Sequence, residues 1–221
     1  MYLVQRLLVC LITSLITTMV CESGLADESF SFRTMTWNIW HGGREDGEKI
    51  GPKRVVEIIQ QSKADIVAMQ ETYGSGEWIS KQLGFHFHPR GTNVSIHSRY
   101  PVLEDISVFE KFKCVGALLE LPGGRKIAFY SIWLPYNKEI WVEGTRNVND
   151  LDAMKYACDA SRDNLEKMWA LIQNRLSDSQ YAGIPIVIAG DFNSMSHLDY
   201  LESFRDQFDG VVIDWPTSHI L

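Results

Sequence analysis

The sequence predicts an α+β fold, a sandwich with β-sheets inside and helices outside. Two observations predict it: strands alternate with amphipathic helices near both ends of the chain, and a series of short strands joined by turns lies between them. After the N-terminal leader, no repeat, low-complexity stretch or Pro/Gly-rich linker interrupts this pattern. Residues 27–221 are therefore predicted to form one domain.

The N-terminal part of this domain is predicted to alternate strands and helices. The first helix has a proline near its start, which suits the first helical turn. Four apolar residues are expected to share one of its faces: Val55, Val56, Ile58 and Ile59. A second, shorter helix is closed by Gly84. The predicted strands are 32–37 and 65–70, and the predicted helices are 52–63 and 76–83.

The middle of the chain is predicted to be rich in strands. Its apolar segments are short, and turn residues separate them. Pro122-Gly123-Gly124 supplies a turn between the last two, which should therefore pair as an antiparallel hairpin. The four predicted strands are 94–97, 102–109, 114–121 and 126–133.

A long loop over residues 135–149 follows the last of these strands. Loops of this length inside a compact domain are usually functional or flexible. This one carries Tyr136, Trp141 and Arg146, and its length and aromatic content suggest a lid over a substrate.

The C-terminal part returns to helices and a strand. Residues 150–176 are predicted to form the strongest helix of the chain, because apolar residues recur along it at helical spacing. Residues 184–189 form a fully apolar strand. Ser196 is placed to cap a last helix that runs to about Phe208.

The first 26 residues have the features of a cleaved signal peptide. Arg6 precedes an apolar stretch over residues 7–20, and Gly24-Leu25-Ala26 supplies a cleavage site after Ala26. An uncleaved membrane anchor is the alternative, but the stretch contains four hydroxyl residues and is shorter than the roughly 20 residues that a membrane span needs. We expect export to the periplasm or the extracellular space.

Charge and cysteine content narrow the function. The formal net charge of −7 argues against a protein that holds nucleic acid on a broad basic surface. It argues little against an enzyme that binds phosphate through a metal, since the cation supplies the positive charge. After the leader only Cys114 and Cys158 remain, and they either pair in an oxidising compartment or stay as buried thiols. Their separation does not suggest a zinc site.

Three apolar strands end on polar side chains that can bind a cation or position a water molecule. Asn38 follows the first strand, Glu71 the second, and Asp191 with Asn193 the last. A strand fixes such a side chain, while the loop after it leaves room for a ligand. Amide and carboxylate oxygens are the ligands that magnesium, manganese and calcium prefer.

Each of these residues also has a purely structural explanation. Asn38 could be a turn residue, and Glu71 could be a solvated carboxylate at the start of a loop. Asp191 with Asn193 could form an Asx-type turn. Their joint occurrence, in this order and after strands of this kind, favours a functional site.

Four segments of the chain resemble the endonuclease/exonuclease/phosphatase superfamily, which includes deoxyribonucleases, apurinic-site endonucleases, inositol-polyphosphate 5-phosphatases and sphingomyelinases. They keep the family's order and span nearly all of the domain. The segments are Thr34-Met35-Thr36-Trp37-Asn38-Ile39-Trp40, Asp65-Ile66-Val67-Ala68-Met69-Gln70-Glu71, Ser98-Arg99-Tyr100-Pro101 and Ala189-Gly190-Asp191-Phe192-Asn193-Ser194. The resemblance implies a four-layer α/β/β/α sandwich, with two packed mixed β-sheets flanked by helices.

The resemblance also implies a role for each polar residue. Glu71 matches the main carboxylate ligand of a catalytic Mg²⁺ (or Mn²⁺), with Asn38 beside it. Asp191 matches the residue that orients or deprotonates the attacking water. Asn193 matches an amide that hydrogen-bonds the phosphate or helps to place Asp191. A metal to neutralise the phosphate, a carboxylate to aim water and neutral amides to donate hydrogen bonds make a coherent set.

The chain departs from the family's pattern in two places. Trp133 stands where many members have a histidine, and it has a donor N–H but cannot accept a proton; alternatively, it is a core or pocket-wall residue. The family's terminal Asp-His strand has no counterpart after Asp191, and Ser218-His219-Ile220 does not replace it. We therefore expect the C-terminal part of the fold to be missing.

The resulting hypothesis is an exported, metal-dependent phosphoester hydrolase, a phosphodiesterase or a phosphatase. Its substrate would be a small molecule, a phospholipid head group or nucleic acid; no stable protein partner is expected, and the protein should be a monomer. The alternatives are a secreted nuclease and a non-catalytic module that binds a phosphorylated ligand. His86 and His88 could share a metal, although exposed histidines are commoner, and His41 or Arg44 could touch a substrate phosphate.

Overall fold

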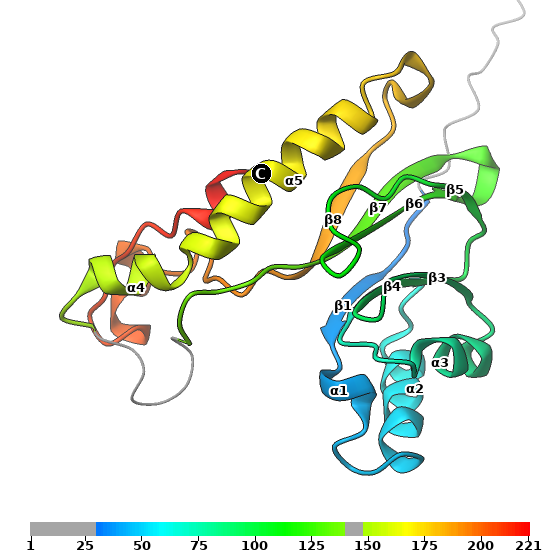
Figure 1. Cartoon of the computed structure of the whole chain (residues 1–221), viewed down its shortest axis with the longest axis horizontal. Coiled ribbons are helices and arrows are strands. Elements are labelled where there is room, and N and C mark those ends of the chain that lie inside the picture. Colours follow the sequence, from blue (N-terminus) through cyan, green and yellow to red (C-terminus); the bar gives the residue numbers. More distant parts are fainter. Residues whose placement is uncertain (1–29, 140–147) are drawn as a thin grey trace, which may run out of the picture. The chain divides into compact units, whose positions relative to one another are not determined.

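The computed structural model describes residues 30–139 and 148–221, which Figure 1 colours along the chain. The predicted leader, residues 1–26, and the part of the predicted lid with Trp141 lie outside the described residues. Within the described residues, no helix is long and apolar enough to cross a membrane.

The first sheet is mixed and has the strand order β1-β2-β4-β3. The strands are β1 (Thr34–Asn38), β2 (Ile66–Gln70), β3 (His86–Arg90) and β4 (Val94–Ser98). β1 and β2 are parallel because helix α2 (Ile50–Ser62) crosses between them, whereas β4 is antiparallel to both β2 and β3. The predicted strands of this half are confirmed.

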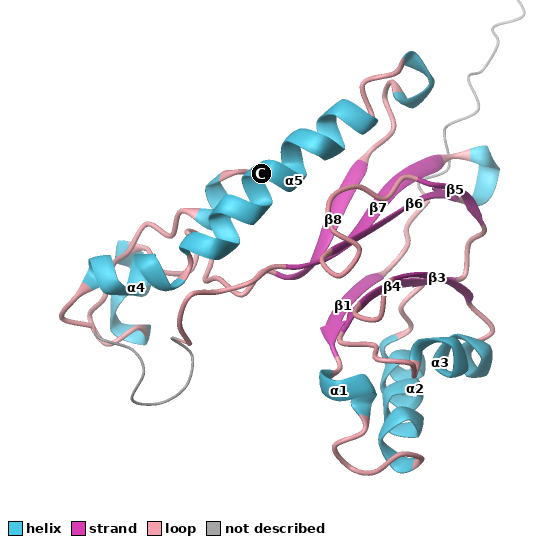
Figure 2. Cartoon of the chain, viewed as in Figure 1, coloured by secondary structure: helices cyan, strands magenta, loops and turns pink. Residues whose placement is uncertain are grey.

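Helices α2 and α3 (Gly76–Leu83) cover one face of this sheet (Figure 2). Val55, Val56 and Ile59 of α2 are buried with Val67 and Met69 of β2. Ile58 is 42% exposed, so its predicted place on the buried face was wrong. The predicted end of α3 is confirmed, because Gly84 closes it at φ 69°, a left-handed conformation that suits glycine.

The second sheet is also mixed and has the order β5-β6-β7-β8. The strands are β5 (Val102–Asp105), β6 (Cys114–Glu120), β7 (Lys126–Trp133) and β8 (Ile186–Asp191). β5, β6 and β7 are antiparallel in turn, and β8 is parallel to β7. The predicted hairpin is confirmed, with a single 3₁₀ turn, η1 (Pro122–Gly124), between β6 and β7.

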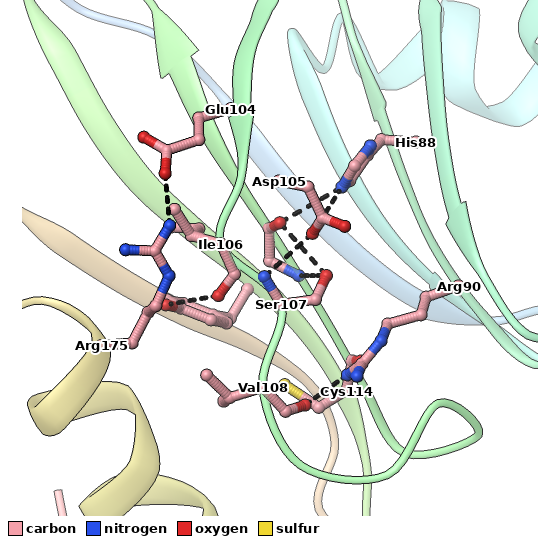
Figure 3. Close-up of polar contacts among 11 residues, drawn as sticks. His88, Arg90, Glu104, Asp105, Ile106, Ser107, Val108, Cys114 and Arg175 are labelled. Atoms are coloured by element: carbon pink, nitrogen blue, oxygen red, sulfur yellow. Dashed lines mark hydrogen bonds and ion pairs between the residues drawn. The ribbon is translucent and has the colours of Figure 1, made fainter.

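β5 ends at Asp105, so it is shorter than the predicted strand 102–109. Backbone carbonyls later in the predicted strand bond to the side chain of Arg90 instead of to another strand. The guanidinium of Arg90 donates hydrogen bonds to the carbonyl oxygens of Val108 and Cys114 (Figure 3). It also donates to the carbonyl oxygen of Phe109. The carbonyls of Val108 and Phe109 are therefore satisfied outside the ladder, and beyond Asp105 the backbone N–H of Ile106 donates to β6, to the carbonyl oxygen of Gly116 (3.0 Å).

The predicted helix over 150–176 is two helices, α4 (Leu151–Ala157) and α5 (Asp159–Arg175). Cys158, at φ −99° and ψ 2°, separates them. The two helices pack in different places: Leu165, Met168 and Ile172 of α5 join the core on the second sheet, whereas Met154 and Ala157 of α4 join a cluster with Tyr200 and Trp215. One straight helix would not reach both.

The predicted helix from Ser196 to about Phe208 was wrong. The residues there form turns and one 3₁₀ segment, η3 (Glu202–Gln207), and a second, η4 (Thr217–His219), follows later in the chain. Ser196 Oγ accepts a hydrogen bond from Leu198 N (3.1 Å), which is a turn contact rather than the start of a helix. Two other short segments are α1 (Trp40–Gly43) and η2 (Ser179–Tyr181).

The two sheets pack against each other through the faces that the helices do not cover. Ala128, Tyr130 and Ile132 of β7 pack with α5, so by alternation Phe129 and Ser131 point to the opposite face. There Ser131 Oγ accepts a hydrogen bond from Gln70 Nε2 of the first sheet (3.0 Å). The layer order helix, sheet, sheet, helix confirms the predicted α+β four-layer sandwich with two mixed sheets.

Candidate functional site

Three strand ends bring Asn38, Glu71 and Asp191 together. β1 and β2 are parallel neighbours, so Asn38 and Glu71 leave the first sheet at the same edge. Asp191 ends β8 of the second sheet. Asn38 Nδ2 donates hydrogen bonds to Glu71 Oε1 (2.9 Å) and to Asp191 Oδ2 (2.9 Å), so one amide joins both carboxylates.

The loop after β1 folds over Glu71. The backbone N–H of Trp40 donates to Asn38 Oδ1 (3.0 Å), and that of His41 donates to Glu71 Oε2 (3.3 Å). Gly42 N donates to the carbonyl oxygen of Glu71 (2.7 Å). Trp40 and His41 both have a positive φ, a rare conformation for such residues, and it turns their N–H groups toward the site.

Glu71 itself has a left-handed backbone, with φ 55°, and Asn93 holds it there. Asn93 is fully buried; its Oδ1 accepts from Glu71 N (2.8 Å), and its Nδ2 donates to the carbonyl oxygen of Phe112 (2.9 Å). Its own carbonyl oxygen accepts from Thr72 N (3.0 Å). Sequence reasoning missed Asn93, since nothing distinguishes it from an ordinary polar residue at the start of a strand.

A buried chain of hydrogen bonds continues from this turn into the first sheet. Thr72 Oγ1 lies 2.8 Å from Ser95 Oγ, which lies 2.9 Å from His97 Nε2, and His97 Nδ1 lies 2.7 Å from Ser80 Oγ. Burial lowers the pKa of His97 to about 3, so its imidazole is neutral in the folded protein. The neutral ring donates from one nitrogen and accepts at the other, and both are satisfied.

Asn193 holds Asp191 rather than pointing its amide into the site. Its backbone N–H donates to Asp191 Oδ1 (3.1 Å), and its Nδ2 donates to the carbonyl oxygen of Leu134 (2.7 Å). The carbonyl oxygen of Asn193 accepts from Ser161 Oγ of α5 (3.0 Å). The Asx-type turn and the positioning of Asp191 therefore occur together.

Glu71 and Asp191 are not neutralised by a basic side chain in the part of the chain that the structure describes. Among residues 30–139 and 148–221, no lysine or arginine forms an ion pair with Glu71 or Asp191. The pKa of Tyr73 is raised by burial and by the charge of Glu71. That of Tyr136 is also raised by burial, with smaller contributions from the charges of Glu139, Asp191 and Glu71. The site therefore carries a negative field that favours a cation.

The donor set fits a hard divalent cation. Carboxylate and amide oxygens are the ligands that Mg²⁺ and Mn²⁺ accept. One residue before Glu71, the buried Gln70 Oε1 has no hydrogen-bond donor in the described part of the chain. Asn38 Oδ1 accepts a hydrogen bond from Trp40 N, and Asn38 Nδ2 faces the two carboxylates. For Asn38 to ligate a cation through its oxygen, the amide would have to rotate by a half-turn.

The walls of the site come from Trp133 and from the residues after β8. Trp133 ends β7 opposite Asp191 in the parallel register and is half-buried, as a pocket-wall residue would be. A hollow of about 640 Å³ lies beside Asp191 and Asn193, lined by residues 190–196, Asp199, Thr217 and Ser218. His219 pairs with Asp214 and stacks on His197, with ring centroids 3.9 Å apart.

His41, His88 and Arg44 have partners within the protein. His88 Nε2 lies 3.4 Å from Asp105 Oδ1 (Figure 3). It also lies 3.2 Å from the carbonyl oxygen of Gly116. The described residues contain no group of three or more His, Cys, Asp or Glu that could hold a metal, so no such cluster forms around His86 and His88. Arg44 donates to the carbonyl oxygen of Tyr73 and to Ser75 Oγ.

Cys114 and Cys158 are both buried and have free thiols. Burial raises the pKa of Cys114 to about 12, with a smaller opposing contribution from a backbone hydrogen bond. Burial also raises the pKa of Cys158. Of the two alternatives, buried thiols and a disulfide, the structure has the thiols.

The chain belongs to the endonuclease/exonuclease/phosphatase family, since residues 35–215 match its family model. An uncharacterized protein of Caenorhabditis elegans is 25% identical over 217 residues, which cover 92% of this chain and 67% of that protein. The predicted resemblance is thereby confirmed at the level of the family.

Solved structures share the fold. A mannosyl-6-phosphatase from Bacteroides thetaiotaomicron is similar with a TM-score of 0.55 and 13% identity, over 81% of this chain and 70% of that one. An endonuclease/exonuclease/phosphatase from Beutenbergia cavernae is similar with a TM-score of 0.50 and 15% identity, over 73% of this chain. The match spans 47% of the Beutenbergia chain, less than half of its length.

Proposed function

We propose that the chain hydrolyses a phosphate ester at the site formed by Asn38, Glu71 and Asp191, with Mg²⁺ or Mn²⁺ as cofactor. The observation that carries the proposal is the Asn38 amide, which hydrogen-bonds to carboxylates from two different sheets. Two carboxylates held close together by one amide repel each other, and this destabilises the fold unless a cation binds between them. Membership of a family of phosphoester hydrolases supports the same chemistry.

Each residue has a role that follows from its contacts. Glu71, held by Asn93 and covered by the loop after β1, would hold the cation. A bound divalent cation supplies positive charge to the phosphoryl oxygens. Asp191 is fixed at both oxygens, by Asn38 and by Asn193 N, so its free lone pairs can accept a hydrogen bond from the attacking water.

The test is turnover of p-nitrophenyl phosphate and bis(p-nitrophenyl) phosphate with and without chelator. We expect activity that chelator abolishes and Mg²⁺ or Mn²⁺ restores. Asp191→Asn should lower kcat by a factor of about 10² to 10⁴, because it removes the acceptor for the water proton. Asp206→Asn, an exposed aspartate in η3, is the matched control and should retain full activity. Unchanged turnover in Asp191→Asn would contradict the proposal.

Non-catalytic binding of a phosphorylated ligand is the second candidate, and Trp133 favours it. An indole N–H can donate to a phosphate oxygen but cannot exchange a proton, unlike the histidine that many relatives have. Saturable binding of inorganic phosphate in the presence of Mn²⁺, without turnover of either ester, would support this candidate. Turnover that depends on Asp191 would exclude it.

Export is also part of the proposal. Its support is the sequence of residues 1–26, where a cationic residue, an apolar stretch and small residues before a cleavage site occur in order. Expression of the full chain followed by N-terminal sequencing of the exported product tests it. The expected first residue is Asp27, and an intact Met1 in the exported fraction would contradict cleavage.

A further inference from the structure

Five aromatic rings form a continuous row beside the site. Neighbouring ring centroids lie 5.7, 6.4, 6.5 and 5.6 Å apart along the row. In order, the rings belong to Trp40, His41, Tyr73, Phe112 and Trp133. Four separate segments of the chain supply them, so the row is made by the fold and not by a local run of aromatic residues.

The row borders the candidate site along its length. Its first two members donate their backbone N–H groups to Asn38 and Glu71. Tyr73 follows Glu71 by two residues, and the carbonyl oxygen of Phe112 accepts from Asn93, which holds Glu71. Trp133 is opposite Asp191 in the β7–β8 register. The organic part of an ester bound at the site would therefore lie against these rings.

Solvent reaches the row, although aromatic rings are normally buried. Trp40 is 63% exposed and Phe112 is 39% exposed. Contiguous apolar surface of this kind on a folded protein usually marks a binding site. The inner rings also do not stack on one another: the His41–Tyr73 and Tyr73–Phe112 pairs are tilted at more than 6 Å, whereas Tyr200 and Phe208 stack at 4.0 Å. The faces of these rings are therefore not covered by stacking on one another.

We propose that this row, Trp40 to Trp133, binds the organic part of the substrate by stacking and selects esters of flat, unsaturated rings. The inference rests on the proposed function, because it concerns the substrate of the same site. Its ligand class is an aryl phosphate or a nucleotide, in preference to an ester of glycerol or of a hexose. Stacking suits any flat ring, since each presents a π-face.

Charge restricts the ligand to a short one. The net charge of −7 opposes binding of a long polyanion or of an anionic membrane. Glu45 also accepts from His41 Nδ1 (2.6 Å), which fixes the orientation of one ring of the row. A short ester with one ring and one phosphate carries little negative charge, so this repulsion opposes it least.

The experiment compares phenyl phosphate with cyclohexyl phosphate, which have similar size but differ in flatness. Dissociation constants are measured with Mg²⁺ on the Asp191→Asn protein, so that binding is separated from turnover. We expect phenyl phosphate to bind at least about tenfold more tightly, and Trp40→Ala or Phe112→Ala to reduce this preference by roughly five- to tenfold. Trp78→Ala is the matched control, since Trp78 is 44% exposed but outside the row, and it should leave the preference unchanged.

Further arms separate the possible ligands. The affinity for thymidine monophosphate should also fall in Trp40→Ala and in Phe112→Ala. Equal affinities for phenyl phosphate and cyclohexyl phosphate would overturn the proposal. Affinity that rises steeply with the length of an oligothymidylate would overturn the restriction to short esters. Binding of phosphatidylcholine vesicles that is lost in Trp40→Ala, without a ring preference, would assign the row to a membrane instead. Ring preference without any hydrolysis by the wild type would contradict the proposed function but not the row.

Discussion

Asn38 Nδ2 lies 2.9 Å from Asp191 Oδ2, although 153 positions of the chain separate the two residues. The same nitrogen lies 2.9 Å from Glu71 Oε1, so the amide connects the end of β1 to both carboxylates. Because Asp191 belongs to the second sheet and the other two residues to the first, this contact depends on how the sheets pack. The site is therefore a product of the whole sandwich rather than of one motif.

Removal of the Asn38 amide should affect turnover more than folding. In Asn38→Ala the two carboxylates lose their common donor, and Asp191 loses one of the two hydrogen bonds that fix it. We expect kcat at saturating Mg²⁺ to fall by a factor of about 10² to 10³. Asn174→Ala, at an exposed position of α5, is the control. A kcat within a factor of two or so of wild type would contradict a role for this amide.

Asn93 should control metal affinity through Glu71. Asn93→Ala removes the acceptor for Glu71 N, so the left-handed turn is no longer held and the carboxylate is misplaced. Loss of such a supporting residue typically weakens metal affinity by about 10- to 100-fold. Calorimetric titration with Mn²⁺ measures the change.

A conservative variant separates positioning by Asn93 from general destabilisation. Asn93→Asp keeps an oxygen to accept from Glu71 N but loses the donor to the Phe112 carbonyl oxygen. If Asn93 acts through Glu71, the aspartate variant should bind Mn²⁺ more tightly than the alanine variant at equal unfolding midpoints. Equal Mn²⁺ affinity in wild type and Asn93→Ala would rule out positioning.

His97 should make stability depend on pH. Its pKa is about 3 in the folded protein and 6.5 when unperturbed, because burial disfavours the charged ring. Between these values the unfolded chain binds the extra proton, so stability is complete above pH 6.5 and falls as the pH decreases toward 3. The expected loss in the free energy of unfolding is roughly 2 kcal/mol between about pH 7 and about pH 5.

Urea unfolding at the two pH values tests this dependence. His97→Asn should be less stable at neutral pH, because Ser80 and Ser95 lose their buried partner, but its pH dependence over this range should be flatter. His86→Asn, an exposed histidine of β3, should keep the wild-type slope. An unchanged slope in His97→Asn would assign the pH dependence to other groups.

Gly190 should tolerate no side chain. A Cβ there would lie 2.1 Å from the carbonyl oxygen of Ile132, which belongs to the backbone of β7 and cannot turn away. Gly190→Ala should therefore lower the free energy of unfolding by about 1–3 kcal/mol or more and displace Asp191, the next residue. Gly124→Ala meets nothing within 4 Å and has only the strain of its φ of 73°, so it should cost less. Thermal unfolding compares the two.

The sequence predicted the elements that carry a clear apolar period, and it failed where tertiary packing decides. The strand ends at Asn38, Glu71 and Asp191 follow short apolar runs, so both the strands and the candidate residues were predictable. The break at Cys158 was not, because helical spacing continues through it while its two sides pack in different clusters. Ser196 has the residue type of a helix cap, but the described residues after it form 3₁₀ segments and no α-helix, so the cap alone did not predict the structure.

The parts of the site that were missed are contacts between distant segments. Asn93 reaches Glu71 N across 22 positions, and Phe112 joins the aromatic row from a loop between β5 and β6. Neither contact leaves a pattern in the sequence, because the first depends on the pairing of β2 with β4 and the second on the packing of one sheet against the other. Trp133 was identified in the sequence, but its position in the row required the fold.

Mg²⁺-dependent recovery of activity in chelator-treated protein, compared between wild type and Glu71→Gln, shows most directly whether Glu71 holds a catalytic cation. Glu71→Gln keeps the shape of the side chain but removes its charge, and Glu77→Gln, on the exposed side of α3, is the matched control. Wild type and the control should recover at the same Mg²⁺ concentration, and Glu71→Gln should need at least about tenfold more or fail to recover. Recovery of Glu71→Gln at the wild-type concentration, or wild-type activity that survives chelation, would contradict the proposed cation site.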